Sequence, residues 1–233
     1  MRKIRTGISG LDEMLYGGMI VSRAYLIKGT PGAGKTIFGI QFLTHGVKEN
    51  EKTLFISLEE KKGNLIENMA AFGWDLSKIN IIEATPEIGS DMWEIKGESP
   101  FGLRLSLSNL MSVIGKETEG SEGRIVIDSL TTLKMLYDTP LDARREVLTL
   151  IHFLSSTGWT SLLLAETHGS EGSMESFLAD GVVKLHSITD KGIKRRAIEI
   201  EKMRGTDFDE QLRPMKITNK GIVVYSDEAL FKS

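Results

Sequence analysis

Short, continuously apolar runs recur along the chain at similar intervals. Runs of this length are typical of strands that are buried on both faces of a parallel sheet. The runs that predict strands are Ala24–Lys28, Thr53–Leu58, Arg124–Asp128 and Ser161–Ala165, and a shorter strand is expected at Asn80–Glu83.

Amphipathic stretches separate these runs, because their apolar residues recur at the three- and four-residue spacing of a helix. Helices are expected at Thr36–Val47, at Leu65–Phe72 before Gly73, at Leu103–Ile114 and at Val147–Leu154. A short helix is also expected around Leu11, since Ser9 to Asp12 form a capping-box pattern and Gly17-Gly18 would end it.

The order of these elements predicts the fold class. Strands that alternate with helices form an α/β fold with a mostly parallel central sheet flanked by helices. After Gly181 strand-like segments follow one another, which predicts antiparallel strands added near the C-terminus. We expect residues 1–233 to form one domain, with ligands bound at the carboxyl ends of the parallel strands.

Composition narrows the function classes. Of the 233 residues, 40% are hydrophobic and 26% are charged, as in ordinary globular domains. The net charge of −3 argues against a broadly basic nucleic-acid binder, and the lack of cysteine excludes disulfides and thiolate metal sites. The start of the chain has no apolar leader core and no apolar run is long enough to span a bilayer, so we expect a cytoplasmic protein without a membrane partner.

One glycine-rich segment carries the most specific motif. Gly29–Thr36 reads GTPGAGKT and matches G-x-x-x-x-G-K-[ST], with a predicted strand before it and a predicted helix after it. In such a loop, backbone N–H groups and the helix N-terminus hold phosphate oxygens, Lys35 reaches the β- and γ-phosphates, and the Thr36 hydroxyl ligates Mg²⁺. The residues expected to contact ATP here are Gly29, Thr30, Pro31, Gly32, Ala33, Gly34, Lys35, Thr36 and Ile37.

Acidic residues follow the buried strands. Asp128 ends the run RIVID, where a carboxylate can hold Mg²⁺; capping of the next turn is the structural alternative. Glu59 and Glu60 follow TLFISL, and one of them can activate an attacking water. Adjacent residues of an extended segment point to opposite sides, so only one can face the nucleotide, and the pattern does not show which. Glu166 is a candidate contact to the γ-phosphate, with an ordinary surface loop as the alternative.

A basic segment lies late in the chain. Lys202 and Arg204 are two residues apart on a predicted strand, so they point the same way and can neutralise charge on a phosphoryl group, including one bound by a neighbouring subunit. The structural alternative is an edge strand with its charges in solvent. The cluster Lys194–Arg196 is expected on such a solvated edge, because the acids Glu199 and Glu201 share its segment.

Five motifs in order resemble those of one family. They are TGISGLDEMLYGG (Thr6–Gly18), GTPGAGKT, SLEE followed by AFGWDL (Ala71–Leu76), RIVIDSLTTL, and EKMRGT (Glu201–Thr206). With them the chain resembles a single KaiC-type domain, a branch of the RecA/RadA group of ATPases, over nearly its whole length. The resemblance implies a RecA-like core, ATP hydrolysis, and assembly into rings, commonly hexamers, with nucleotide at the subunit interfaces.

The resemblance also implies roles for particular residues. Glu59 and Glu60 match the family's catalytic glutamate pair, and Asp128 matches its Mg²⁺-associated acid. Lys202 and Arg204 match basic residues that reach the γ-phosphate held by the neighbouring subunit. This favours a catalytic role for these two residues over the solvated edge strand.

The expected function is ATP binding and Mg²⁺-dependent ATP hydrolysis by a homo-oligomer that acts in signalling or DNA-related regulation. One alternative is a RadA-paralogue ATPase of DNA recombination or repair, with single-stranded DNA as its partner. The other is an ATP-gated scaffold that binds a signalling protein without hydrolysis. The glutamate pair in SLEE favours hydrolysis over the scaffold.

Overall fold

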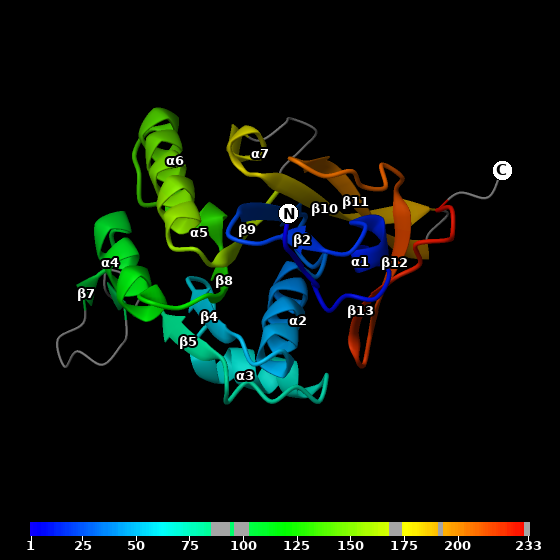
Figure 1. The fold of residues 1–233 in the computed structure, drawn as a ribbon, viewed down its shortest axis with the longest axis horizontal. Coiled ribbons are helices and arrows are strands. Elements are labelled where there is room, and N and C mark those ends of the chain that lie inside the picture. Colours follow the sequence, from blue (N-terminus) through cyan, green and yellow to red (C-terminus); the bar gives the residue numbers. More distant parts are fainter. Residues whose placement is uncertain (85–93, 96–102, 168–173, 191–192, 231–233) are drawn as a thin grey trace.

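In the computed structural model the described residues form a nine-stranded central sheet (Figure 1). The structure describes residues 1–84, 94–95, 103–167, 174–190 and 193–230. The strand order is β13-β12-β11-β10-β3-β9-β8-β4-β5. The strands are β3 (Ala24–Gly29), β4 (Lys52–Ser57), β5 (Asn80–Glu83), β8 (Gly123–Asp128), β9 (Thr160–Glu166), β10 (Gly181–Asp190), β11 (Ile193–Met203), β12 (Arg213–Thr218) and β13 (Gly221–Val224).

The larger part of the sheet is parallel. Strands β10, β3, β9, β8, β4 and β5 pair in parallel with their neighbours, and every residue of β3 is buried. Burial on both faces explains why these strands are apolar throughout. The predicted α/β fold with a mostly parallel sheet is confirmed.

The remaining strands form an antiparallel extension at one edge. β11 pairs with β10, β12 with β11, and β13 with β12, all antiparallel, as predicted for the chain after Gly181. In β11, Arg196 lies opposite Ser187, and Met203 lies opposite Gly181. Since Gly181 pairs with Tyr25 near the start of β3, strand β11 runs from the carboxyl edge of the parallel strands back to their amino edge.

Helices cover both faces of the sheet (Figure 1). Apolar side chains of α1 (Leu11–Met14), α2 (Lys35–Lys48) and α3 (Lys62–Ala70) join one buried cluster. Those of α4 (Leu107–Thr118), α5 (Leu130–Lys134), α6 (Pro140–Ser156) and α7 (Met174–Leu178) join a second cluster on the opposite face. The sheet therefore lies between two helical layers, and the two cores hold its strand ends in fixed positions.

Two local expectations were wrong. Ser9 does not cap α1: the cap residue is Gly10, and the Asp12 carboxylate accepts from the N–H and hydroxyl of Thr6 instead. Leu103 is not helical, because β7 (Leu103–Arg104) pairs with β6 (Glu94–Ile95), and α4 begins at Leu107 after its cap residue Ser106. A second short pair joins β1 (Lys3–Ile4) to β2 (Met19–Ile20).

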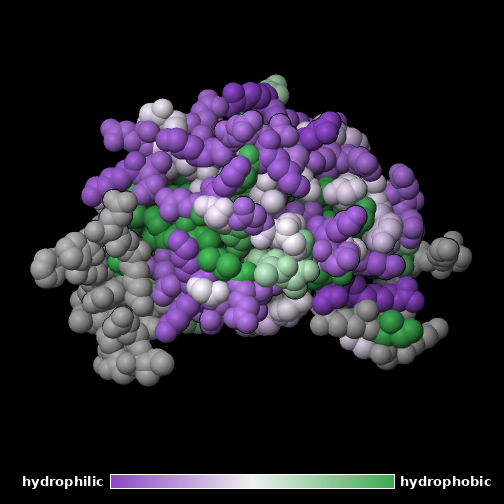
Figure 2. Space-filling view, turned by 90° about the horizontal axis from the view of Figure 1, so that it is seen from below, coloured by the Kyte–Doolittle hydropathy of each residue, from purple (hydrophilic) through white to green (hydrophobic). Residues whose placement is uncertain are grey.

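The outer surface is mixed in character. Figure 2 shows a face that is mostly hydrophilic, with hydrophobic residues gathered in a smaller area in its left half. Within the described residues, none of the helices has the length and apolar character that crossing a bilayer requires.

Candidate functional site

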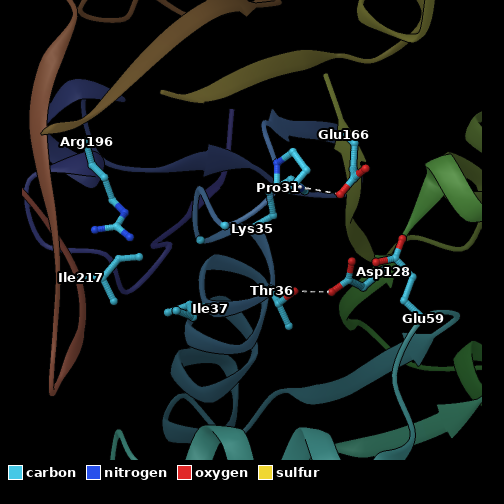
Figure 3. Close-up of a pocket in the computed structure, with 11 residues that line it drawn as sticks. Pro31, Lys35, Thr36, Ile37, Glu59, Asp128, Glu166, Arg196 and Ile217 are labelled. Atoms are coloured by element: carbon cyan, nitrogen blue, oxygen red, sulfur yellow. Dashed lines mark hydrogen bonds and ion pairs between the residues drawn. The ribbon is translucent and has the colours of Figure 1, made fainter. Parts of the chain in front are cut away.

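A cleft of about 560 Å³ opens at the carboxyl ends of the parallel strands (Figure 3). Ligands of open α/β sheets bind at this edge. The loop after β3, the ends of β4, β8 and β9, and strands β11 and β12 all contribute to its walls. The lining residues are Pro31, Gly32, Gly34, Lys35, Thr36, Ile37, Glu59, Asp128, Glu166, Arg196 and Ile217.

The loop between β3 and α2 needs glycine at two positions for different reasons. Gly34 has φ 107°, and a Cβ there would lie 2.9 Å from Cδ1 of Ile217. At Gly29 a Cβ would lie 2.6 Å from the Leu185 carbonyl oxygen. A side chain at either position would push the loop away from the sheet. The loop is thus fixed against β10 and β12, and α2 starts directly behind it with its N-terminus toward the cleft.

The side chains that follow the loop converge with Asp128. The Lys35 ammonium donates to the carbonyls of Gly29 and Thr30, at 3.1 and 3.3 Å, and the Thr36 hydroxyl donates to Oδ2 of Asp128 at 2.7 Å. Lys35 and Asp128 are both buried. A cation and a carboxylate therefore flank the start of α2 in a site largely withdrawn from water.

Burial raises the pKa of Asp128 to about 6. Desolvation of the carboxylate is the largest cause, and the nearby Glu59 adds to it, whereas the Thr36 hydroxyl and Lys35 act in the opposite direction. The ionised form of Asp128 is thus only partly compensated by its protein neighbours. A cation at this position would complete the compensation.

The two adjacent glutamates take different directions. Glu59 lines the cleft, and its Oε1 accepts hydrogen bonds from the hydroxyls of Ser129 and Thr132 at the start of α5. Glu60 does not line the cleft: its Oε1 accepts from the Asn68 side chain on α3. The structure therefore brings Glu59, but not Glu60, to the cleft.

Glu166 lies beside the lysine of the loop. Its Oε1 is 3.8 Å from Nζ of Lys35 (Figure 3). Its backbone N–H donates to the Thr131 hydroxyl at 2.8 Å. The next backbone N–H, of Thr167, donates to the Gly29 carbonyl at 3.2 Å. The end of β9 is thereby tied both to the phosphate loop and to α5.

Comparison with known proteins identifies the family. The family described as "ATPase: KaiC" matches residues 4–229. The chain belongs to the KaiC family. Membership supports an ATP-binding P-loop ATPase domain with a RecA-like sheet, in agreement with the strand order and the loop after β3.

The chain matches nearly the whole length of one relative in the KaiC family but less than half of others. The chain is 35% identical to the circadian clock oscillator protein KaiC of Rippkaea orientalis over 97% of its own length and 44% of that protein. It is 34% identical to the circadian clock oscillator protein KaiC of Synechococcus elongatus, over 96% of its own length and 44% of that protein. A UPF0273 protein of Aeropyrum pernix is 33% identical over 98% of this chain and 95% of that protein. The chain thus spans less than half of the clock proteins that it matches.

The late basic pair of this KaiC-family chain lies away from its own cleft. Nζ of Lys202 donates to the carbonyls of Ser176, Phe177 and Ala179 at 2.6–3.0 Å, and Nη2 of Arg204 donates to Phe177 as well. Both side chains point the same way, toward the C-terminal end of α7. They lie near the amino edge of the sheet, so they do not line the cleft that holds Lys35.

Two cleft residues were not expected. Arg196, assigned to a solvated edge, lines the cleft from β11 together with Ile217 from β12. They stand opposite Glu59, Asp128 and Glu166 (Figure 3). Conversely, Thr30 is exposed beyond the cleft lining and Ala33 is buried in the core. No local pattern marks Arg196, because its position depends on the pairing of β11 with β10 and β12.

Proposed function

We propose that this chain binds ATP with Mg²⁺ in the cleft and hydrolyses its γ-phosphate bond, with Glu59 as the general base. The observation that supports hydrolysis is the position of Glu59: a carboxylate in the cleft, anchored through one oxygen, across from the lysine and helix N-terminus that would hold the phosphates. Family membership supports ATP binding.

The loop supplies the triphosphate site. Backbone N–H groups from Gly32 to Thr36 and the N-terminus of α2 attract phosphate oxygens. Among the described residues, the Lys35 ammonium contacts neutral loop carbonyls and the more distant Glu166, so an anionic phosphate would be a stronger partner. Ile37 and Ile217 give the other end of the cleft an apolar surface suited to a nucleoside.

The donor set near Thr36 suits Mg²⁺. This cation takes oxygen ligands and keeps several waters, so one carboxylate, one hydroxyl and phosphate oxygens are sufficient. Thr36 and Asp128 supply the hydroxyl and the carboxylate, and the raised pKa of Asp128 shows that its charge lacks full compensation. When bound, Mg²⁺ would offset negative charge on the phosphates.

The proposed chemistry uses the second oxygen of Glu59. Oε1 is occupied by two hydroxyl donors, which leaves Oε2 to accept a proton from water as that water attacks the γ-phosphorus in line with the leaving oxygen. Lys35 would neutralise charge on the phosphates. We further propose that Lys202 and Arg204 of a neighbouring copy complete the site in a ring, since their own cleft is out of their reach.

Three substitutions test this function. Lys35→Ala should abolish ATP binding in calorimetry with Mg²⁺ present. Glu59→Gln should keep ATP affinity and lose turnover by ~10²–10⁴-fold, the usual contribution of a general base. Glu60→Gln is the matched control, because the same chemical change occurs one residue away, outside the cleft. Full turnover in Glu59→Gln, or equal losses in both glutamine variants, would contradict the proposal; binding without any turnover in the unmodified chain would favour an ATP-gated scaffold.

A further inference from the structure

The start of α5 presents two hydroxyl groups to a single carboxylate oxygen. Thr132 Oγ1 donates to Oε1 of Glu59 at 2.6 Å, and Ser129 Oγ donates to the same atom. Glu59 itself is exposed to the cleft, whereas Ser129 and Thr132 are 1% and 6% exposed. Among the described residues, the side chains that hold the carboxylate thus lie on its buried side.

The hydroxyls of Ser129 and Thr132 each use their single proton to bind Oε1 of Glu59. A hydroxyl has one proton to give. Ser129 Oγ also accepts from the backbone N–H of Thr132 at 3.3 Å, which makes it the cap of α5, and its proton goes to Glu59. Thr132 Oγ1 gives its proton to Glu59 as well. Within the described part of the chain, no hydrogen bond is formed by Oε2 of Glu59, so the two oxygens of this carboxylate have different environments.

The helix that carries these donors is itself fixed. Leu130 and Leu133 are buried in the core, and the Thr131 hydroxyl accepts from the N–H of Glu166 at the end of β9. The donors therefore stand on an element that is anchored on two sides. A glutamate side chain has three rotatable bonds and loses considerable entropy when fixed, so an anchored donor pair is an effective way to hold it.

From this arrangement we propose that Thr132 is a positioning residue for hydrolysis: its hydroxyl fixes Oε1 of Glu59 so that Oε2 faces the attacking water. This inference rests on the proposed role of Glu59 as the base. Thr132 is not among the described residues that line the cleft, and Glu59 is the lining residue to which its hydroxyl donates. Its effect should therefore appear in the rate of the chemical step and not in nucleotide affinity.

Two substitutions of Thr132 distinguish the effect of its hydroxyl group from the effect of its side-chain volume. Thr132→Val removes the hydroxyl and keeps the branched shape; Thr132→Ser keeps the hydroxyl and removes a methyl group. Thr118→Val is the matched control, because Thr118 is also a buried helical threonine whose hydroxyl donates within the chain, to the Ile114 carbonyl of α4. Each variant is assayed for kcat, for KM, for ADP affinity by calorimetry and for thermal unfolding.

We expect Thr132→Val to lower kcat about tenfold, a part of the ~10²–10⁴ that a general base contributes, with KM and ADP affinity unchanged. Thr132→Ser should retain most of the rate, and Thr118→Val all of it. In a Glu59→Gln background, Thr132→Val should cause no further loss, because the carboxylate that it positions is already absent.

Other results would overturn the inference. Unchanged kcat in Thr132→Val, or loss of rate in Thr132→Ser equal to that in Thr132→Val, would show that the hydroxyl has no such role. An equal tenfold loss in the Glu59→Gln background would show that Thr132 acts by another route. These results leave the proposed function intact, whereas full activity of Glu59→Gln itself would remove the proposed function and this inference together.

Discussion

At the scale of single residues, the negative charge of ionised Asp128 is only partly compensated by the neighbouring side chains. It is 7% exposed, and burial raises its pKa from 3.8 to about 6. The folded chain therefore binds this proton more tightly than the unfolded chain does. Between these two pKa values the contribution of Asp128 to stability falls as pH rises, because ionising it costs more in the folded state.

Replacing Asp128 with Asn should remove the free-energy cost of ionising this side chain in the folded state. We compare the free energy of unfolding of Asp128→Asn with that of the unmodified chain at each pH. The difference, variant minus unmodified chain, should increase by ~1–3 kcal/mol from about pH 4 to about pH 6 and stay level at higher pH. Urea unfolding without nucleotide or Mg²⁺ measures it. Asp75→Asn is the control: hydrogen bonds from Ser77 lower the pKa of Asp75, so its difference should have the opposite sign below about pH 4 and stay nearly level between about pH 4 and about pH 6. A difference that does not vary with pH would refute the account of Asp128.

Arg196 provides a second residue-scale prediction. Its Nε is buried and has no hydrogen-bond partner among the described residues, which is costly for a cationic group. A nucleotide oxygen in the cleft would supply the partner. Arg196→Met should therefore weaken ATP binding about tenfold in calorimetry, which corresponds to ~1.4 kcal/mol. Arg195→Met, one residue away on the same strand and outside the cleft lining, should bind normally; equal affinities for both variants would contradict this role.

At the scale of elements, one buried ion pair joins three separate segments. The Arg124 guanidinium on β8 pairs with Glu51, donates to the carbonyls of Arg5 and Phe42, and lies 4.6 Å from the centre of the Phe42 ring. The side chain of Arg124 is 1% exposed. The start of the chain, the helix behind the phosphate loop and the strand that ends in Asp128 therefore meet at one side chain.

Removing this side chain should destabilise the whole domain. We expect Arg124→Ala to lower the free energy of unfolding by ~3–5 kcal/mol, because two carbonyls and a carboxylate lose their donor and a cavity forms. Arg2→Ala is the matched control: Arg2 pairs with Glu122 on the surface, where a pair contributes ~0–1 kcal/mol. Urea unfolding compares them, and similar losses for both would be inconsistent with the role of burial.

Among the helices and strands, those with a local sequence signal were predicted, whereas contacts between segments far apart in the chain were not. The fully buried strand β3 was predicted to within one residue, because its apolar run records burial on both faces, and the edge strand β5 was predicted at its observed bounds. The phosphate loop was found because its residues are contiguous. Helix α5 was missed, since its few residues give no measurable period, and the contact of Thr132 with Glu59 joins segments far apart in the chain. Arg196 was misplaced for the same reason: strand register is a long-range property.

At the scale of the whole molecule, the position of Lys202 and Arg204 decides how an active assembly would have to be built. In the single chain they bond carbonyls at the end of α7 and lie near the edge of the sheet opposite the cleft. The proposed ring would place them at the next subunit's phosphates. A charged residue supplied in this way contributes ~10³–10⁵ to the rate of phosphoryl transfer.

Mixing two inactive variants tests this arrangement. Glu59→Gln lacks the base but keeps Arg204, and Arg204→Ala lacks the arginine but keeps the base. If sites are shared between copies, the mixture should regain up to about a quarter of normal turnover in an ATPase assay, because some interfaces combine an intact Glu59 with an intact Arg204. Each variant alone is the control. A mixture no more active than its components would show that each chain works by itself.

Strand β11 crosses the molecule from one edge of the sheet to the other, with Arg196 at the cleft and Met203 at the far edge. In the proposed ring, this one strand would then reach two successive nucleotides, one through Arg196 near its start and one through the basic residues at its other end. Every subunit would give its strand end to the same side and receive one from the other side. Each interface of the ring would consequently couple the nucleotide of one subunit to that of the next through the same strand, and this coupling would act equally in both directions.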